Sequence, residues 1–287
     1  MSVNGGKLIL AGAPLGNVAD ASPRLREALG SADVIFAEDT RRLRHLAGDL
    51  GVDSWRLREI HSLFSGNEQE RIPQLKSFLN EGKTVLLITD AGMPGVSDPG
   101  YLPVVAALEL GVPVEVIPGP SAVTTALALS GLPMERFVFD GFPPRTQKAR
   151  KAYIDSIKNQ ERTIVLFEAP HRVKELVADL LDILGGVRRV ALCREMTKTY
   201  EETFRGSLSR LNDWLEGREI LGEVTLVIEG ATAEEIRNRT PEEITRLVAR
   251  REEAGMDRKE AVSAVAEELR VRKREVFDAL VATKMEQ

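Results

Sequence analysis

The sequence predicts an α/β protein with two α/β domains and a small C-terminal helical segment. Short apolar runs alternate with stretches of helical periodicity from about residue 7 to residue 229. The apolar runs lack a strict alternation of apolar and polar residues, which is typical of strands buried on both faces of a mainly parallel sheet. Several of these runs end in Gly, Pro or Asp, and open α/β sheets bind ligands in crevices at such strand ends.

The strands and helices can be placed in order along the chain. Strands are expected at 7–11, 34–37, 84–89, 112–117, 137–139, 163–167, 190–193 and 224–229. Helices are expected at 23–29, 42–50, 69–80, 101–110, 122–129, 148–158, 171–184 and 208–215. The pattern changes phase near 118–120, so we expect an N-terminal domain at 1–118 and a second α/β domain at 119–235.

A helical extension is expected at 236–287. Thr240 and Pro241 are typical of a helix N-cap and first helical position, and Glu242 and Glu243 follow them. Two short helices then fit 257–269 and 273–281, with a turn at 270–272. This arrangement fits a helix-turn-helix. A plain helical hairpin that only caps the fold fits the pattern equally well.

Composition narrows the classes of function. The chain has 287 residues and a net charge of −5, so contacts with nucleic acid would have to come from local basic clusters. One cysteine excludes an intramolecular disulfide, and the three histidines lack tight metal spacing, so no metal site is expected. The N-terminus has no signal-peptide pattern and no apolar run is long enough for a membrane span. We expect a cytoplasmic protein without membrane contact.

Four loops follow the first strands and contain the residue types of a ligand pocket. They cover 12–17 (GAPLGN), 37–41 (AEDTR), 90–100 (DAGMPGVSDPG) and 118–122 (PGPSA). The first is neither a G-x-G-x-x-G fingerprint nor a phosphate-binding loop with Gly-Lys-Ser/Thr, which disfavours both nucleotide folds. We expect these loops to converge into a pocket of backbone donors and carboxylates.

Two further loops follow strands in the second half. They are 168–172 (EAPHR) and 194–198 (REMTK). His171 has the chemistry of a base, although a structural or capping role suits its place in a first helical turn better. Glu195 and Lys198 stand three residues apart, so they would pair if the loop is helical.

Together these motifs carry a resemblance. The loop at 90–100 is similar to the signature of the ribosomal RNA small-subunit methyltransferase I family, within the tetrapyrrole-methylase superfamily of class III S-adenosylmethionine (SAM) methyltransferases. The segments 118–122, 12–17, 37–41, 141–145 (GFPPR), 168–172, 194–198 and 222–224 (GEV) resemble it as well. The motifs span 7 to about 230, and the C-terminal helices resemble the family's helix-turn-helix extension. One stretch departs: 64–68 (FSGNE) lacks two histidines that the family usually carries there.

The resemblance implies a function and a site. It implies 2′-O-methylation of a decoding-centre cytidine in 16S rRNA of the 30S subunit, with SAM bound in the cleft between the two α/β domains, and a homodimer. The expected SAM contacts are Pro14, Asp90, Gly92, Met93, Val96, Ser97, Ser121, Ala122 and Phe167. A tetrapyrrole C-methyltransferase and a non-catalytic, ligand-sensing nucleic-acid-binding protein are the alternatives.

The ribose hydroxyl must lose its proton, so a base within hydrogen-bond reach is needed. The candidate bases, which the sequence does not rank, are Glu38, Asp39, Glu68, His171 and Glu195. Basic side chains near the motifs and at the C-terminal turn are candidates for contacts with RNA phosphates. They are Arg41, Arg42, Arg145, Lys198, Arg272 and Lys273.

Overall fold

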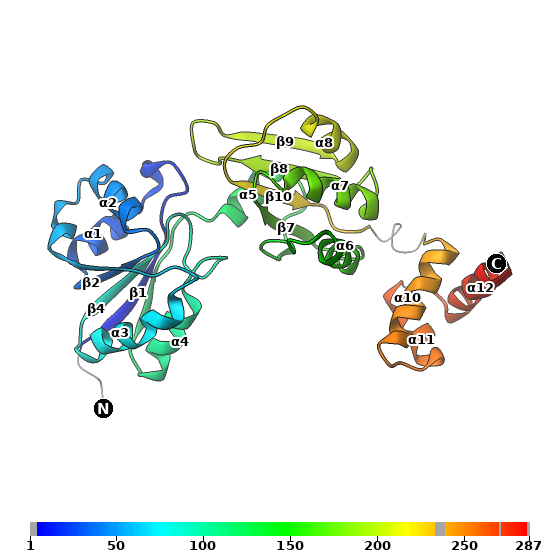
Figure 1. Ribbon diagram of the computed structural model, residues 1–287, viewed down its shortest axis with the longest axis horizontal. Coiled ribbons are helices and arrows are strands. Elements are labelled where there is room, and N and C mark those ends of the chain that lie inside the picture. The colour runs from blue at the N-terminus through cyan, green and yellow to red at the C-terminus, as the bar shows by residue number, and fades with distance from the viewer. Residues whose placement is uncertain (1–4, 233–238, 270, 286–287) are drawn as a thin grey trace.

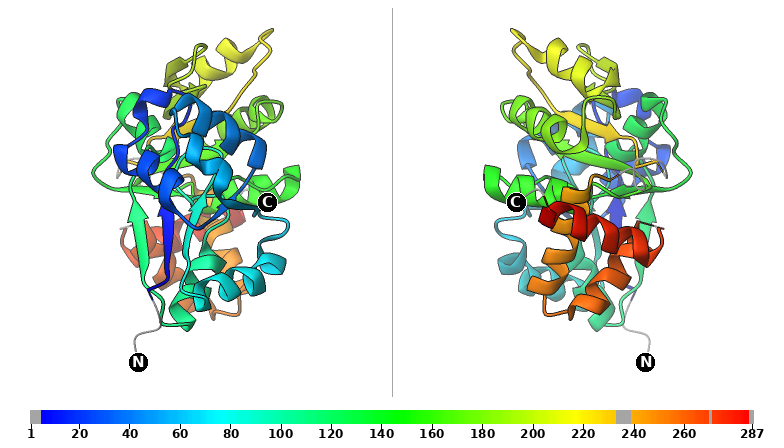
Figure 2. Two further views of the ribbon diagram at one scale, coloured as in Figure 1. Left: turned by 90° about the vertical axis from the view of Figure 1, so that its left-hand side faces the viewer. Right: turned by 90° about the vertical axis from the view of Figure 1, so that its right-hand side faces the viewer.

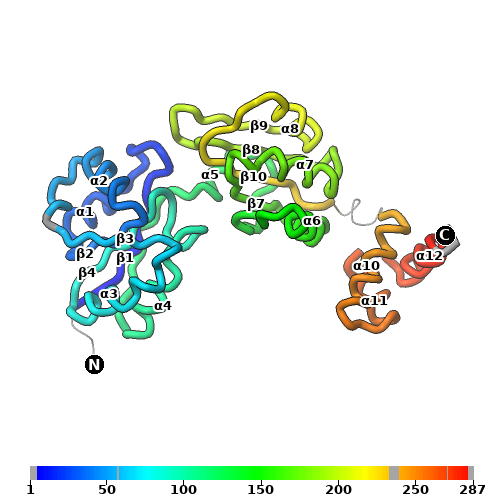
Figure 3. The backbone as a smooth tube through the Cα atoms, in the orientation of Figure 1, coloured from blue at the N-terminus to red at the C-terminus, as the bar shows by residue number. Residues whose placement is uncertain are grey.

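The computed structural model describes residues 5–232, 239–269 and 271–285. Two α/β domains and a bundle of helices follow one another along the long axis of the molecule (Figure 1). The end-on views show the blue and cyan first domain and the orange and red C-terminal helices at opposite ends (Figure 2). The chain crosses from the first sheet to the second between β5 and α5 (Figure 3). The expected boundary at 235/236 falls outside the described residues.

The first sheet has five parallel strands in the order β3-β2-β4-β1-β5. The strands are β1 (Lys7–Ala11), β2 (Val34–Ala37), β3 (Glu59–Ser62), β4 (Thr84–Ile88) and β5 (Val114–Ile117). The helices between them are α1 (Pro23–Ser31), α2 (Thr40–Asp49), α3 (Glu68–Asn80) and α4 (Tyr101–Glu109), with short 3₁₀ turns at Val18–Asp20 and Asp53–Leu57. Because all five strands run the same way, their carboxyl ends meet at one edge of the sheet.

Helices cover both faces of this sheet. Successive strand residues point to opposite faces, so Ile35 packs with α1 and α2 while Phe36 packs with α3. Both side chains are fully buried. This explains the lack of alternation in the sequence, since every strand position needs an apolar residue when both faces are covered.

The second sheet corrects the expectation of a mainly parallel arrangement. Its order is β6-β7-β10-β8-β9, and only the β6–β7 pair is parallel. The strands are β6 (Phe137–Phe139), β7 (Thr163–Glu168), β8 (Arg189–Arg194), β9 (Glu202–Ser207) and β10 (Val224–Ile228). The central strands are largely apolar because helices cover both faces, and that pattern is the same for either strand direction.

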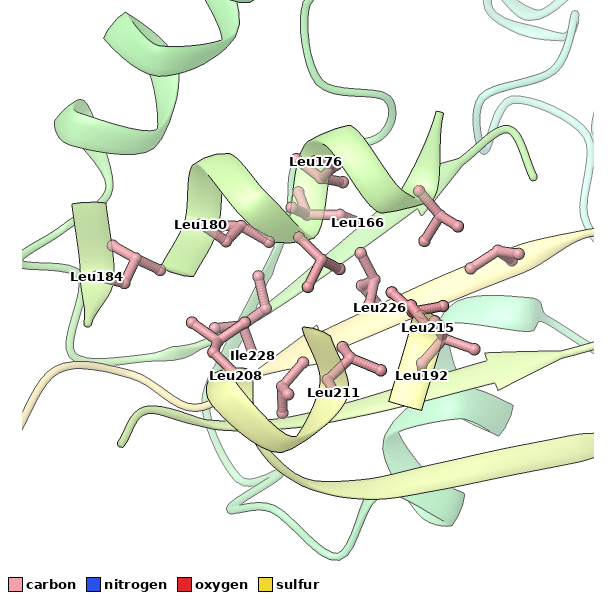
Figure 4. Close-up of a cluster of buried hydrophobic side chains, with 14 of the residues drawn as sticks. Leu166, Leu176, Leu180, Leu184, Leu192, Leu208, Leu211, Leu215, Leu226 and Ile228 are labelled. Carbon is pink, nitrogen blue, oxygen red and sulfur yellow. The ribbon is translucent and has the colours of Figure 1, made fainter. Parts of the chain in front are cut away.

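The core of the second domain lies between this sheet and three helices. They are α6 (Gln147–Ser156), α7 (Val173–Leu184) and α8 (Leu208–Leu215). Figure 4 shows leucines from α7 and α8 meeting Leu166, Leu192 and Leu226 of the central strands. On the opposite face, α5 (Ala122–Ser130) packs against Val165, Ala191 and Val227.

Two edge strands were not predicted. β3 (EIHS) and β9 (ETFRGS) each pair with one neighbouring strand only, and their residues remain partly exposed. Their polar composition resembles that of loops. It is compatible with a strand because half of each edge strand faces solvent.

The C-terminal segment folds as three helices with a small core of its own. They are α10 (Pro241–Glu253), α11 (Arg258–Glu268) and α12 (Lys273–Met285), and their apolar faces bury Val248, Val265 and Val276. Capping boxes begin α10 and α11. Asn159 of the second domain donates to Glu268 of α11 at 2.8 Å, which ties the bundle to that domain. Residues 236–238, Arg270 and 286–287 of the expected extension lie outside the described residues.

Candidate functional site

Backbone contacts join the strand-end loops of the first domain. The amide of Ala13 donates to the carbonyl of Gly92 at 2.8 Å, and the amide of Gly92 donates back at 3.1 Å. Gly12 and Gly119 lie so close that a Cβ atom on Gly12 would be 2.7 Å from the Cα of Gly119. Side chains at these two positions would force the loops apart, so glycine here holds the edge of the site closed.

Carboxylates form a connected group at this edge. Glu38 follows β2 and accepts the amide of Asp90 at 3.1 Å, while Asp90 accepts the amide of Asp39 at 3.1 Å. Arg42 of α2 pairs with Asp90 at 3.4 Å. Burial raises the pKa of Glu38, although the hydrogen bond from Asp90 opposes it. Burial likewise raises the pKa of Asp90.

Asp98 belongs to the same group. Burial, together with the charges of Glu38, Asp90 and Glu223, raises its pKa to about 7. A carboxyl group with this pKa changes protonation state near neutral pH, which is a property of groups that transfer protons.

The second domain supplies the facing wall. Phe167, at the end of β7, packs its ring against Phe142 with the centroids 5.7 Å apart. Glu223 precedes β10, whose first residue Val224 pairs with Glu168. Because β10 runs antiparallel to β7, the beginning of β10 lies at the same edge as the end of β7.

A cavity of about 380 Å³ lies between these two walls. Its volume is in the range of small-molecule sites. Apolar side chains and carboxylates line it together. The lining residues are Leu15, Glu38, Arg42, 90–93, 96–98, Ser121, Ala122, Phe142, 167–170 and 222–225.

Eight of the nine expected SAM contacts line this cavity. They are Asp90, Gly92, Met93, Val96, Ser97, Ser121, Ala122 and Phe167. Pro14 does not line it and instead borders a smaller neighbouring hollow of about 50 Å³ that also contacts Glu38 and Arg42. The structure therefore brings residues from both domains to one place, as the resemblance implies.

The five candidate bases separate into different environments. Glu38 lines the cavity. Asp39 caps α2 and pairs with Arg41 at 2.9 Å, and the hydrogen bonds from Arg41 lower its pKa to about 2, which makes it a poor base. His171 is exposed and lies outside the cavity lining.

Glu68 and Glu195 serve local structure. Glu68 accepts the amides of Gly100 at 2.9 Å and Leu102 at 3.3 Å, so it caps the N-terminus of α4. Burial acts to raise the pKa of Glu195, but hydrogen bonds from the amide of Glu223 and from Lys198 outweigh it and lower that pKa. Neither side chain lines the cavity.

The departing stretch at 64–68 also has a local explanation. The side chain of Asn67 accepts the amide of Phe64 at 2.8 Å and donates to the carbonyl of Ser62 at 3.3 Å. These hydrogen bonds of Asn67 fix the turn that enters α3, whereas Glu68 caps α4. These two residues are therefore accounted for without any role for histidines at 64–66.

The candidate RNA contacts are also dispersed. Arg42 lines the cavity, Arg41 and Arg145 are exposed, and Arg272 and Lys273 are exposed at the start of α12, which lies at the far end of the molecule from the first domain (Figure 1). Lys198 instead contacts Glu195 at 2.9 Å and Glu223 at 3.1 Å.

Sequence reasoning did not assign Asp98 or Glu223 to the site as functional residues. Both stand in segments that carry the resemblance, so the signal was present. The sequence did not single out Glu223 because the expected pocket loops follow strands, whereas Glu223 precedes β10, which enters the sheet at the cavity edge. Its position depends on strand direction, which the apolar pattern does not encode.

The described residues contain neither a candidate metal cluster nor a candidate membrane-spanning helix. Residues 5–232, 239–269 and 271–285 contain no group of three or more His, Cys, Asp or Glu side chains placed to hold a metal ion. No helix within these ranges has the length and apolar character needed to cross a membrane.

The fold and the cavity between the domains define a class. The model of the Tetrapyrrole (Corrin/Porphyrin) Methylases matches residues 7–212, so the chain belongs to that family. Solved structures agree on the fold: uroporphyrin-III-C-methyltransferase from Thermus thermophilus has a TM-score of 0.57 at 21% identity and covers 78% of this chain and 94% of its own. Diphthine synthase has a TM-score of 0.57 at 19% identity, over 78% and 90%.

Curated relatives give the narrower group. The protein named ribosomal RNA small subunit methyltransferase I of Mycobacterium tuberculosis is 44% identical over 288 residues, which is 99% of this chain and 98% of the relative. Proteins of the same name from Bacillus subtilis (36%, covering 97% of both chains) and Thermotoga maritima (42%, covering 78% of this chain and 99% of the relative) also match. The chain belongs to the ribosomal RNA small subunit methyltransferase I family.

Proposed function

We propose that this protein transfers a methyl group from SAM to the ribose 2′-hydroxyl of a cytidine in the decoding centre of 16S rRNA. The observation that carries the proposal is the cavity between the two domains, which combines apolar walls with a group of carboxylates. The names of its curated relatives support ribosomal RNA as the substrate.

The residues of the cavity fit SAM. Leu15, Met93 and Phe167 offer apolar surface to a flat base, and the loops at 90–98 and 121–122 bring backbone close to the ligand. Glu38, Asp90 and the other carboxylates suit a cation, and the sulfonium of SAM is one. When bound, SAM supplies an electrophilic methyl group.

The chain's own part in the reaction is mainly to position the reactants. Methyl transfer is an in-line displacement, and holding two reactants in line supplies much of the rate. The two walls of the cavity, one from each domain, fix one reactant against the other. Exposed cations such as Arg145 of the second domain and Lys273 of the extension would neutralise RNA phosphates.

The acidic cavity also limits how RNA approaches. Phosphates are repelled by Glu38, Asp90 and Glu223, so only the uncharged ribose edge of the target nucleotide suits the cavity. The phosphates would stay on the outer surface with the exposed arginines and lysines.

Two rival functions lead to different results in one experiment. SAM binding is measured by calorimetry, and the protein is then incubated with methyl-labelled SAM in two separate reactions, one with 30S subunits that lack the modification and one with a tetrapyrrole. We expect SAM binding and label in 16S rRNA. Label on a tetrapyrrole but not on RNA would favour the C-methyltransferase, and binding without any transfer would favour a sensor.

The oligomeric state and the location in the cell are also proposals. We propose a homodimer and a cytoplasmic setting, where 30S subunits are found. Light scattering of the purified protein measures the first, and a monomer at micromolar concentration would contradict it.

A further inference from the structure

Phe142 is an aromatic side chain at the opening of the cavity. It lines the cavity and is nevertheless 56% exposed, so it lies where the cavity meets solvent. Phe167 packs against it and also against Phe139, with ring centroids 5.7 and 4.8 Å apart, and these two inner rings pack on the hydrophobic cluster under α5. Of the three rings in this row, Phe142 is the one left open to solvent. The amide of Phe167 also donates to Gly141, directly before Phe142, at 2.8 Å.

Arg172 holds the other side of the loop that carries this ring. It donates to the carbonyls of Pro143 and Pro144 at 3.1 and 3.0 Å. It is held in turn by an ion pair of 3.3 Å with Glu168, whose side chain is fully buried. Two proline rings and these contacts leave the backbone after Phe142 little freedom. The ring is therefore held in place before a ligand arrives, which lowers the entropy cost of binding.

Basic side chains follow the ring on the outer surface. Arg145 ends the loop, Lys148 lies in the first turn of α6, and both are exposed. Proteins bind single-stranded nucleic acid with this combination, because unpaired bases stack on aromatic rings and cations contact the phosphates. The chemistry at this opening therefore suits one unpaired nucleotide and its flanking phosphates.

The position of Phe142 relative to the reaction is also suitable. The acidic lining of the cavity admits the uncharged ribose and excludes phosphates. The base is joined to the same sugar, so a ribose that reaches into the cavity leaves its base at the opening. A base taken out of its stack loses contact with its neighbours, and an exposed aromatic ring can replace one of them.

We propose that Phe142 stacks on the base of the nucleotide whose ribose is methylated. The inference rests on the proposed function, and it adds a contact on the RNA side of the cavity, apart from the loops expected to bind SAM. Every base has a flat π face, so stacking tolerates any base. Phe142 thus fixes where the nucleotide lies, and does not select cytidine over the other bases.

Substitutions at Phe142 test the stacking. We measure kcat/KM for methylation of 30S subunits that lack the modification, at saturating SAM. Loss of one base–aromatic stack corresponds to a loss of roughly 5- to 150-fold, which we expect for Phe142→Ala. Phe142→Tyr and Phe142→Trp should keep most of the activity, whereas Phe142→Leu should behave like Phe142→Ala because leucine lacks a flat ring. The matched control is Phe137→Ala, an exposed phenylalanine of β6 outside the cavity lining, which should match the wild type.

Two further measurements separate stacking from other roles of the ring. Calorimetry should give the same SAM affinity for Phe142→Ala and the wild type, which also shows that the variant is folded. Stacking releases no counterions, so the log–log salt slope of kcat/KM should be unchanged in Phe142→Ala. Arg145→Gln should instead flatten that slope by ~0.7–0.9.

Four results would overturn the inference. They are an unchanged kcat/KM in Phe142→Ala, full activity in Phe142→Leu, weaker SAM binding in Phe142→Ala, and a salt slope that Phe142→Ala flattens as Arg145→Gln does. The third would place the ring against SAM, and the fourth would show that it only positions Arg145. A wild-type protein that does not methylate 30S subunits contradicts the proposed function itself. A wild type that methylates, with Phe142→Ala equally active, contradicts only the inference on Phe142.

Discussion

Lys198 of the second domain lies over Gly16 of the first, so closely that a Cβ atom at position 16 would clash with the Lys198 side chain. The ammonium group of Lys198 is held by Glu195 at 2.9 Å and Glu223 at 3.1 Å. Next to it, the amide of Asn17 donates to the hydroxyl of Thr197 at 3.2 Å. This contact joins the loop after β1 to the loop after β8 at the side of the cavity.

The Lys198 contact predicts that this residue contributes little to RNA binding through its charge. We expect Lys198→Met to leave the salt dependence of RNA binding unchanged, because its ammonium group already has two carboxylate partners. The double variant Arg272→Gln with Lys273→Gln should reduce the log–log salt slope by up to ~1.4–1.8, at ~0.7–0.9 per phosphate contact. Filter binding to 16S rRNA fragments over a range of salt measures both. A flatter slope in Lys198→Met would show that Lys198 contacts phosphate.

Two substitutions in the loop at 90–98 should separate the effect of backbone strain from the effect of lost contact with SAM. Gly92 and Gly95 both have positive φ, 74° and 85°, so valine strains the backbone at either position. Only Gly92 lines the cavity, and a side chain on Gly95 would meet open space. We expect Gly92→Val to abolish SAM binding in calorimetry and Gly95→Val to retain it. Equal effects of the two substitutions on SAM affinity would show that strain alone is responsible.

The raised pKa of Asp98 predicts a change of stability with pH. The folded protein binds a proton more tightly than the unfolded chain, so Asp98 destabilises the fold increasingly as pH rises from about 4 to about 7. Asp98→Asn should therefore be more stable than the wild type at pH 8. The full shift corresponds to ~4 kcal/mol, which solvent screening reduces to on the order of 2 kcal/mol.

Urea denaturation at pH 8 and near pH 4 measures this difference in unfolding free energy. The advantage of Asp98→Asn should fall to a small fraction of its pH 8 value near pH 4, where Asp98 is protonated in the folded protein and about half protonated in the unfolded chain. An advantage of equal size at both pH values would assign the effect to something other than this titration.

We expect the C-terminal helices to contribute to methylation of 30S subunits but not to SAM binding. Deleting 236–287 removes the bundle, which has its own core and no residue in the cavity lining. The relative from Thermotoga maritima matches 78% of this chain over 99% of its own length. A member of the family is therefore shorter than this chain. We expect unchanged SAM affinity, weaker methylation of 30S subunits and a flatter salt dependence. A folded truncated protein that methylates with unchanged efficiency and salt slope would leave the helices a purely structural role.

Much of this fold was predictable from local sequence. The runs at 7–11 and 34–37 were placed to the residue, because buried central strands are apolar throughout and end at Gly or acidic residues. The edge strands β3 and β9 were not, since their polar residues resemble those of loops. The antiparallel direction of β10 could not be predicted from local sequence either, because strand pairing is set by contacts between segments that are distant in sequence.

The site divides in the same way. Loops such as 90–98 were recognisable because close backbone approach demands particular residues. The role of each carboxylate was not, because it depends on partners brought together by the fold: Asp39 and Glu68 turned out to cap helices, while Asp98 stands without a partner among the described residues. Local sequence shows which residues have ionisable side chains near the site. Tertiary contacts determine which of these side chains lack a hydrogen-bond partner.

The proposed function depends on methylation of a ribose 2′-hydroxyl. Its most direct test is to treat 30S subunits that lack the modification with the wild-type protein and SAM, digest the 16S rRNA to nucleosides, and identify the product by mass spectrometry. We expect one new 2′-O-methylcytidine per subunit, mapped to the decoding centre and absent with heat-inactivated protein. A methyl group on a base, or 16S rRNA without any new methyl group, would contradict it.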